Sequence, residues 1–461
     1  MENIQEPIPE NKMGVMPINK LVFNISLPMM ISMLVQAMYN IVDSIFVAKL
    51  SENALTAVSL AFPLQTLLIA VGAGTGVGMN ALLSKSLGEK NFKRANDTAS
   101  NSALIFLMSG ILFLILGFTI VHPFYAGQIG SADPQIMEYG VSYLTIVMTC
   151  SFGLFGQFLF ERLLTSTGKT VYSMISQLSG AITNIILDPI MIFGLLGCPA
   201  MGVAGAAVAT VIGQFVGAFV GAFCHFKYNK EISMTLKGYR PNGKIIWKIY
   251  QVGIPSIVMQ SIGSVMTYCM NLILMSFSAT AAAVFGVYFK LQSFFFMPVF
   301  GLNNGITPII AYSYGARQRK RMIKTIRLSM GIAFGLLLVG FAAFEGVPGL
   351  LLSFFDASEE MLAIGVPALR TIALSFLLAW FCIIAGTVFQ ALGHAVFSLI
   401  VSVMRQLVVL VPAAYILAKL GGLHAVWWSF PIAELMSGLV SGVFLTWIYR
   451  KVIRLLPEGK E

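Results

Sequence analysis

The chain has 461 residues, of which 57% are hydrophobic and only 10% are charged, with a net charge of +10. Soluble domains carry about 25% charged residues, so this composition excludes a soluble protein and with it a soluble enzyme. At about 20 residues per membrane crossing, the chain has room for roughly a dozen helices and for no large domain outside the membrane. The sequence therefore predicts an all-α polytopic membrane protein.

Apolar runs separated by loop signals predict twelve transmembrane helices in two six-helix lobes. The expected spans are 21–46, 55–83, 98–122, 138–160, 171–194, 202–226, 249–275, 281–313, 328–352, 363–390, 397–419 and 425–449. The expected organisation is an N-terminal tail (1–20), an N-lobe (21–226), an inter-lobe linker (227–248), a C-lobe (249–449) and a C-terminal tail (450–461).

The distribution of Lys and Arg predicts the orientation in the membrane. The gaps on the side of the two termini carry 24 Lys and Arg, with Arg162 and Lys169 counted among them, whereas the opposite side carries only Lys49 and Lys419. Because cytoplasmic loops are enriched in Lys and Arg, we expect both tails and the linker to be cytoplasmic. The first twenty residues contain three Glu and lack the basic region of a signal peptide, so we expect no cleaved leader.

The two halves of the sequence repeat each other. The segment LQTLLIAVGAGTGVGMNALLSKSLGEKNFKR, which starts at Leu64, resembles LQSFFFMPVFGLNNGITPIIAYSYGARQRKR, which starts at Leu291. The same shift of 227 relates Pro28 to Pro255, and TGKTVYSMI matches LGHAVFSLI with a shift of 225. Six duplicated helices form a parallel repeat about an axis along the membrane normal. This architecture is typical of an alternating-access transporter; a larger helical bundle without transport is the alternative.

Several familiar motifs are absent or accounted for by packing. The run VGAGTGVG from Val71 to Gly78 lies inside an apolar helix without a preceding strand, so we interpret it as a small-residue helix contact and not as a nucleotide loop. The sequence contains no HExxH and no GxxxxGK[ST] motif, so neither zinc chemistry nor ATP hydrolysis is expected. The positive charges lie in short loops, which argues against a nucleic-acid partner.

Polar residues at membrane depth are costly and mark candidate functional sites. In the first helix, Asp43 shares a face with Gln36 and Asn40. In the fifth helix, a longer polar face consists of Ser173, Gln177, Asn184 and Asp188. Both faces must avoid lipid.

The acidic residues of these two faces are expected to meet. At a rise of 1.5 Å per residue, Asp43, Asp188 and Thr210 all lie roughly 9 to 12 Å beneath the outer surface. Two neighbouring carboxylates away from water cannot both remain ionised, so the pair can hold a proton or a cation. Asn184 and the Thr210 hydroxyl can complete an oxygen site for Na⁺, with Asp43 and Asp188 as its charged ligands. Two unrelated buried acids with packing partners are the alternative.

Three prolines inside the predicted helices are candidate hinges, because proline interrupts the hydrogen-bond ladder of a helix. These residues are Pro28, Pro189 and Pro255.

The C-lobe carries a different set of polar residues. Lys290 and Glu434 both lie about 14 Å below the outer surface, so we expect a structural ion pair between them, with a cavity-lining role as the alternative. The candidates for a substrate cavity in this lobe are Lys290, Phe294, Arg405 and Glu434.

The sequence resembles the multidrug and toxic compound extrusion (MATE) family over nearly its whole length, and within that family the bacterial DinF/MepA-like branch. The resemblance is carried by LPMMISMLVQAMYNIVDSIFVAKL in the first helix and by NIILDPIMIFG and MGVAGAAVAT in the fifth and sixth. It implies Asp43, Asn184, Asp188 and Thr210 as cation-coupling residues. It also implies export of lipophilic, often cationic, compounds in exchange for H⁺ or Na⁺ across a bacterial cytoplasmic membrane.

Two further expectations follow from the resemblance. The C-lobe stretches IPSIVMQSIGSV and IALSFLLAWFCIIAG contain no acid, so a sodium site of the kind that another branch of the family has there is not expected. We expect a monomer that needs no cofactor besides the coupling ion. The alternative function is flipping of a lipid-linked precursor by a member of the same superfamily, which requires basic residues in the cleft.

Overall fold

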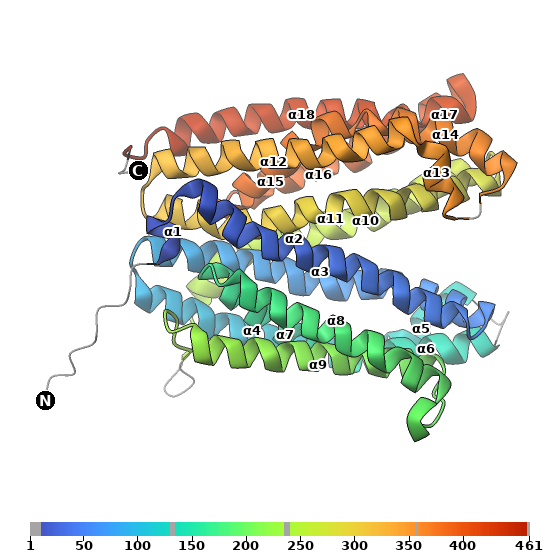
Figure 1. The fold of residues 1–461 in the computed structure, drawn as a ribbon, viewed down its shortest axis with the longest axis horizontal. Helices are drawn as coiled ribbons and strands as arrows, with labels where there is room; N and C mark the ends of the chain where they lie inside the picture. The colour runs from blue at the N-terminus through green and yellow to red at the C-terminus, as the bar shows by residue number, and fades with distance from the viewer. Residues whose placement is uncertain (1–10, 130–133, 235–239, 356, 459–461) are drawn as a thin grey trace, which may run out of the picture.

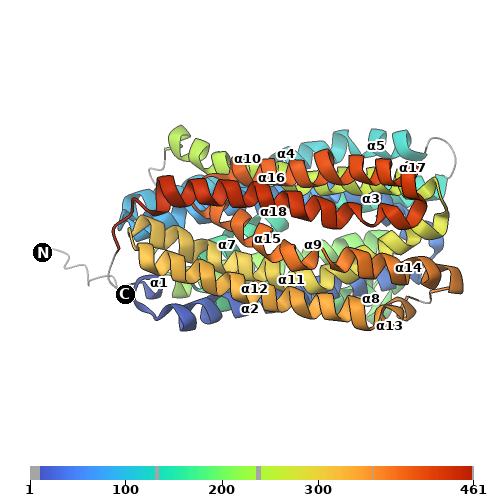
Figure 2. The same ribbon diagram turned by 90° about the horizontal axis from the view of Figure 1, so that it is seen from above.

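The fold of the protein is helical throughout the part that the structure describes. The computed structural model describes residues 11–129, 134–234, 240–355 and 357–458, and within these ranges it contains helices and no strand. Long helices run side by side, and both termini lie at one end of the bundle (Figures 1 and 2). We call this the termini end and the opposite end the far end. The predicted all-α architecture is confirmed.

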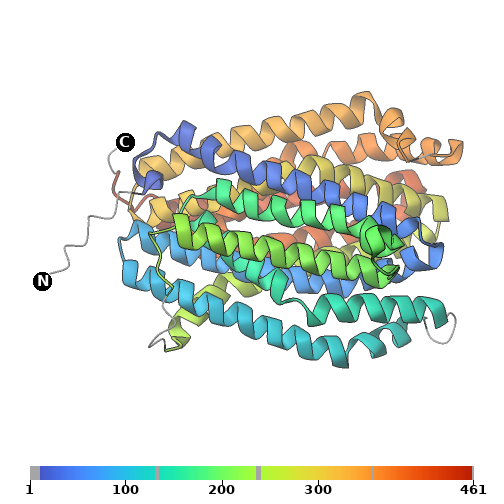
Figure 3. The same cartoon turned by 60° about the horizontal axis from the view of Figure 1, so that its bottom comes forward.

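The N-terminal half begins with a short helix and then crosses the bundle repeatedly. Its elements are α1 (Lys12–Val15), α2 (Ile18–Ala48), α3 (Glu52–Gly88), α4 (Phe92–Thr119), α5 (Val121–Ile129), α6 (Pro134–Thr149), α7 (Phe152–Ser166), α8 (Thr170–Phe193), η1 (Leu195–Gly197) and α9 (Val203–Tyr228). Figure 3 shows α8 and α9 side by side at the front of this half.

The C-terminal half follows the same plan. Its elements are α10 (Gly243–Met275), α11 (Ala279–Gly315), α12 (Arg319–Gly346), α13 (Pro348–Ser353), α14 (Glu359–Ala373), α15 (Phe376–Ala391), α16 (Ala395–Val403), η2 (Met404–Leu410), α17 (Val411–Val426), α18 (Ser429–Ile448) and η3 (Tyr449–Ile453). A short π-helical stretch, η2, joins α16 to α17.

The number of membrane spans agrees with the sequence. In the described residues, ten helices are long and apolar enough to cross a membrane, and the bent pairs α6–α7 (43°) and α14–α15 (51°) raise the number to twelve if each pair is one span. These pairs correspond to the fourth and tenth predicted spans. The helices are longer than predicted: α2 begins inside the expected tail, and α9 and α10 extend into the expected linker.

The internal repeat extends to backbone detail. Ser51 and Ser278, which differ by the repeat shift, each cap the following helix by accepting a hydrogen bond from the backbone N–H three residues later. Lys90 and Arg317 occupy the left-handed region with φ of 56° and 55°, although neither is glycine. The repeat therefore preserves local conformation as well as sequence.

The two halves are held together by glycines at the termini end. A Cβ on Gly88 of α3 would lie 2.1 Å from the Tyr312 carbonyl oxygen of α11, and a Cβ on Gly315 would lie 2.2 Å from the Lys85 carbonyl oxygen. Only glycine allows this backbone contact. Since Gly88 and Gly315 are repeat equivalents, the contact has the symmetry of the repeat.

A second pair of glycine contacts continues this interface along the helices. Gly78 of α3 packs against the Ile249 carbonyl of α10, and its equivalent Gly305 of α11 packs against Ser26 of α2. The interpretation of VGAGTGVG as a small-residue helix contact is confirmed, because a Cβ on Gly78 would lie 2.1 Å from that carbonyl oxygen.

The segment around α1 also joins the two halves at the termini end. Met13 is fully buried, and Arg321 of α12 donates from Nη2 to the Met13 and Met16 carbonyl oxygens at 2.9 and 2.8 Å. On the other side, Asn11 donates to the Thr167 carbonyl oxygen at 3.2 Å. The part of the expected tail that the structure describes is therefore folded against both lobes.

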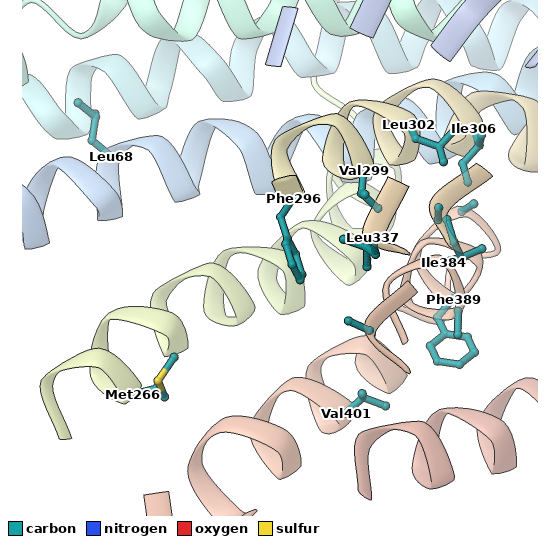
Figure 4. Close-up of a cluster of buried hydrophobic side chains, with 14 of the residues drawn as sticks. Leu68, Met266, Phe296, Val299, Leu302, Ile306, Leu337, Ile384, Phe389 and Val401 are labelled. Atoms are coloured by element: carbon teal, nitrogen blue, oxygen red, sulfur yellow. The ribbon is translucent and has the colours of Figure 1, made fainter. Parts of the chain in front are cut away.

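The C-terminal half has a continuous apolar core. Phe296, Val299 and Leu302 of α11 point towards Leu337 of α12 and Ile384 of α15 (Figure 4). All five side chains are buried. Transfer of such a side chain from water to a protein core is worth roughly 1.5–3 kcal/mol, but within the bilayer the alternative environment is lipid, which is also apolar. Close packing therefore carries most of the stability within the bilayer.

The glycine contact at the termini end predicts the effect of a single methyl group. We expect Gly315→Ala to lower the melting temperature of the purified protein, because the new Cβ must push α11 away from α3. Gly331→Ala on α12 is the matched control, since no atom lies within 4 Å of its added Cβ. Equal melting temperatures of the two variants in detergent micelles would contradict the predicted clash.

Candidate functional site

The N-terminal half encloses a cavity among α2, α7, α8 and α9, with an empty volume of about 700 Å³ including the space at its mouth. Its polar lining includes Gln36, Tyr39, Gln177, Asn184 and Thr210, and its larger apolar lining residues are Met29, Met33, Leu154 and Phe158.

Asp43 and Asp188 meet at the far end of this cavity. Asp43 lies one helical turn beyond Tyr39 on α2, and Asp188 lies one turn beyond Asn184 on α8. Their carboxyl groups lie close enough to interact electrostatically, and two carboxyl groups that approach to hydrogen-bonding distance need a proton between them. Asp188 is fully buried, and Asp43 Oδ1 is buried without an N–H or hydroxyl donor. The predicted meeting of the two acids is therefore present in the structure.

Asn184 and Thr210 lie beside this carboxyl pair. In the orientation of its amide that satisfies both ends, Asn184 donates from Nδ2 to Asp188 Oδ2 at 3.3 Å and accepts from the Thr210 hydroxyl at 3.3 Å. Close packing of α8 on α9 brings these residues together: a Cβ on Gly180 would lie 2.8 Å from the Gly213 carbonyl oxygen. The four predicted residues thus form one cluster of oxygen-bearing side chains.

The other predicted polar residues of the N-lobe divide between the cavity and its surroundings. Gln177 donates to Gln36 at 2.8 Å, and both line the cavity. Ser173 is buried and accepts from the Thr165 hydroxyl at 3.3 Å. Asn40, in contrast, is exposed and is not part of the lining.

Two charged residues of the cavity were not predicted. Glu161 and Arg162 lie inside α7 and are 7% and 5% exposed. The expectation that Arg162 belongs to a cytoplasmic loop is wrong, because α7 continues to Ser166 and ends before Gly168, whose φ is 81°. The adjacent charges resembled a loop, whereas the TSTG sequence after them was the better signal for the end of the helix.

The C-lobe residues are arranged differently from the expectation. Glu434 on α18 forms an ion pair with Arg405 of η2 at 3.3 Å, and the predicted pair with Lys290 is wrong. Lys290 lies over the Phe355 ring at 5.9 Å. The prediction used only the depth of Lys290 and Glu434 in the membrane, which does not fix the direction in which the Lys290 side chain points from α11. Neither Lys290, Phe294, Arg405 nor Glu434 lines the N-lobe cavity, and Phe294 is 52% exposed.

The three candidate hinge prolines all lie inside continuous helices. Pro28 is in α2, Pro189 in α8 and Pro255 in α10. Pro189 directly follows Asp188, so the interrupted hydrogen-bond ladder adjoins the carboxyl pair. Their role as hinges stays a prediction.

A twelve-span repeat with a buried polar cluster beside a cavity defines a membrane transporter. The MatE family model matches residues 28–190 and 255–416, once in each half. The chain belongs to this family, the MATE transporters, whose members are not enzymes.

Curated relatives and solved structures agree with this assignment to the DinF/MepA-like branch. The chain is 28% identical over 426 residues to the multidrug export protein MepA of Staphylococcus haemolyticus, covering 92% of each chain. It is 27% identical to MepA of Staphylococcus aureus, covering 92% of this chain and 93% of the relative. A MATE family transporter in an outward-facing conformation superposes with a TM-score of 0.91 at 25% identity, covering 98% of this chain and 100% of that one.

The Arg405–Glu434 pair predicts a measurable coupling in stability. Glu434→Gln leaves the Arg405 charge without its partner, at a cost of about 3 kcal/mol in unfolding free energy, the low end for buried pairs because a third of the Arg405 side chain is accessible. The double variant with Arg405→Gln should recover much of this loss. Lys290→Gln is the control and should show no coupling to Glu434. Additive losses at Arg405 and Glu434 in denaturant titrations would contradict the pairing.

Proposed function

We propose that the chain is a secondary active antiporter that exports lipophilic, often cationic, compounds in exchange for H⁺ or Na⁺. The observation that carries the proposal is the contact between the Asp43 and Asp188 carboxyl groups at the end of the N-lobe cavity. The names of the MepA relatives, multidrug export proteins, support the class of cargo.

The carboxyl pair binds the coupling ion. Two carboxylates in contact repel each other strongly away from water, so the pair retains one proton or takes up a cation. Asn184 donates to Asp188 and accepts from Thr210, so this chain of hydrogen bonds fixes the Asp188 carboxyl. The Thr210 hydroxyl and, after rotation of its amide, Asn184 supply neutral oxygens that suit a Na⁺ ion. Entry of the ion removes negative charge from the cavity and weakens the binding of a cationic compound.

Transport proceeds by alternating access between the two lobes. The glycine contacts of Gly88 and Gly315 and the segment around α1 join the two halves at the termini end, so we expect the cavity to open towards the far end. The excess of Lys and Arg at the termini end supports a cytoplasmic location for both termini. A location in the bacterial cytoplasmic membrane is part of the proposal. We propose that the protein works as a monomer.

The alternative, a flippase of lipid-linked precursors, receives less support. Recognition of phosphate needs unpaired cationic side chains in the cleft. Arg162 is the one cation among the residues that line the N-lobe cavity, and its guanidinium donates to Asn304 of the other lobe. In the C-lobe, Arg405 is neutralised by Glu434.

The proposed function predicts the effect of neutralising either of the two acids. We expect Asp43→Asn and Asp188→Asn each to abolish export of a lipophilic cation driven by an ion gradient in proteoliposomes, because an amide holds neither a proton nor a sodium ion in exchange. The variants should remain folded, as size-exclusion profiles will show. Wild-type rates in a folded variant would remove that residue from the mechanism.

The proposed function also predicts that affinity for a cationic compound depends on pH. As the pH is lowered from about 8 to about 5, affinity for a permanently charged lipophilic cation should fall, because protonation of the pair removes negative charge from the cavity. Asp188→Asn should remove most of this dependence. Fluorescence binding to purified protein, with and without Na⁺, measures the effect, and pH-independent affinity in the wild-type protein would count against the coupling role.

A further inference from the structure

The N-lobe cavity contains a third carboxylate, which the coupling mechanism does not use. Glu161 of α7 lines the cavity and is 7% exposed. Its Oε1 accepts a hydrogen bond from Gln157 Nε2 at 2.8 Å. Within the described ranges, no Lys, Arg or His forms an ion pair with it. A buried carboxylate with one neutral donor is poorly compensated, so it favours the arrival of a positive charge.

The neighbouring Arg162 is directed elsewhere. Its side chain passes over Gly76 of α3, where an added Cβ would lie 2.9 Å from Arg162 Cγ. Its Nη1 donates to Asn304 Oδ1 of α11 at 3.0 Å, in the other lobe. The guanidinium therefore connects the two halves and leaves the Glu161 carboxylate available to the cavity.

Glu161 and the coupling pair occupy different levels of the cavity. The α7–α8 hairpin turns between Ser166 and Thr170, so Glu161 lies near the level of Gln177. Asp188 is three turns farther along α8 than Gln177, or about 16 Å. One ligand charge beside Glu161 and one ion between the two aspartates therefore do not compete for the same atoms.

The walls around Glu161 suit an apolar molecule that carries a positive charge. Met29 and Met33 of α2 and Leu154 and Phe158 of α7 line the cavity. Methionine side chains adapt to differently shaped apolar surfaces, and the faces of aromatic rings attract cations. Such a lining can therefore bind compounds of different shapes.

The charges of the cavity and the pair can be counted. In its ionised form Glu161 contributes −1, Arg162 contributes +1, and the Asp43–Asp188 pair contributes −1 when it shares one proton. The total of −1 favours one positive charge. A coupling ion at the pair brings the total to zero and favours release of that charge.

We propose that Glu161 is the anionic contact for the charged group of the substrate and sets the charge class of the exported compounds as lipophilic monocations. The inference rests on the proposed function, in which the N-lobe cavity is the substrate site. The aspartate pair holds the coupling ion, whereas Glu161 distinguishes a cation from a neutral compound of similar shape.

The test compares tetraphenylphosphonium, a permanent monocation, with triphenylphosphine oxide, a neutral compound with an oxygen in place of one of the four phenyl groups. Purified wild-type protein should bind the cation more tightly. Glu161→Gln should lower affinity for the cation by at least about tenfold, because a unit charge a few ångströms away is lost in a medium of low dielectric, and should leave affinity for the oxide unchanged. Glu161→Asp should retain the preference for the cation.

Two further variants separate a charge effect from a loss of structure. Glu138→Gln removes an exposed carboxylate of α6 in the same lobe and should change neither affinity. Glu161→Ala, a second neutral variant, should lose the preference for the cation as Glu161→Gln does, and it serves if the Gln variant does not fold. A wild-type preference for the cation in a folded neutral variant, or equal loss of both ligands, would overturn the inference.

Transport measurements in proteoliposomes test the proposed function separately from the role of Glu161. If wild-type protein in proteoliposomes does not export tetraphenylphosphonium under either ion gradient, the proposed function fails. If wild-type protein exports it and a folded neutral variant at Glu161 exports it with the same selectivity over the oxide, only the role of Glu161 fails.

Discussion

The closeness of two carboxyl groups, one buried and one half-buried, is the constraint on which transport by this protein depends. Asp43 and Asp188 come from different helices and meet where water is scarce. If both carboxyl groups were ionised and in contact, they would repel each other by several kcal/mol even at an effective dielectric of about 20. The pair must therefore hold a proton or another cation, and its occupancy changes the charge that the cavity presents to a ligand. Because α2 packs on α8, the two aspartates lie beside the cavity, and binding of the ion and binding of the substrate affect each other.

The repeat and the coupling cluster could be predicted from the sequence, because both leave signals that need no knowledge of packing. A constant shift of 227 identifies the duplication, and the structure extends it to the strained backbones of Lys90 and Arg317. Spacing of four residues places Asn184 and Asp188 on one face of a helix, and counting from the loops places Asp43 at the same depth. Their proximity then follows from the cost of exposing them to lipid.

The remaining polar residues depend on tertiary structure. Arg162 was counted among the loop charges because the predicted span ended at residue 160, and Glu161 was not singled out. In the folded protein both lie inside α7, and each has its own partner, Gln157 and Asn304. Depth also failed to identify the partner of Glu434, since it fixes height and not the direction of a side chain. The π-helical turn that carries Arg405 changes that direction in a way that regular helical spacing does not predict.

Ion release on substrate binding tests the central claim most directly. Tetraphenylphosphonium is added to purified protein in weakly buffered solution, first without Na⁺ and then with it, while the pH and the free Na⁺ concentration are followed. The account predicts that binding of the cation releases protons or Na⁺ from the wild-type protein and that Asp188→Asn binds it without release. Saturable binding to the wild-type protein with no release of either ion would contradict the proposed linkage between the aspartate pair and the substrate.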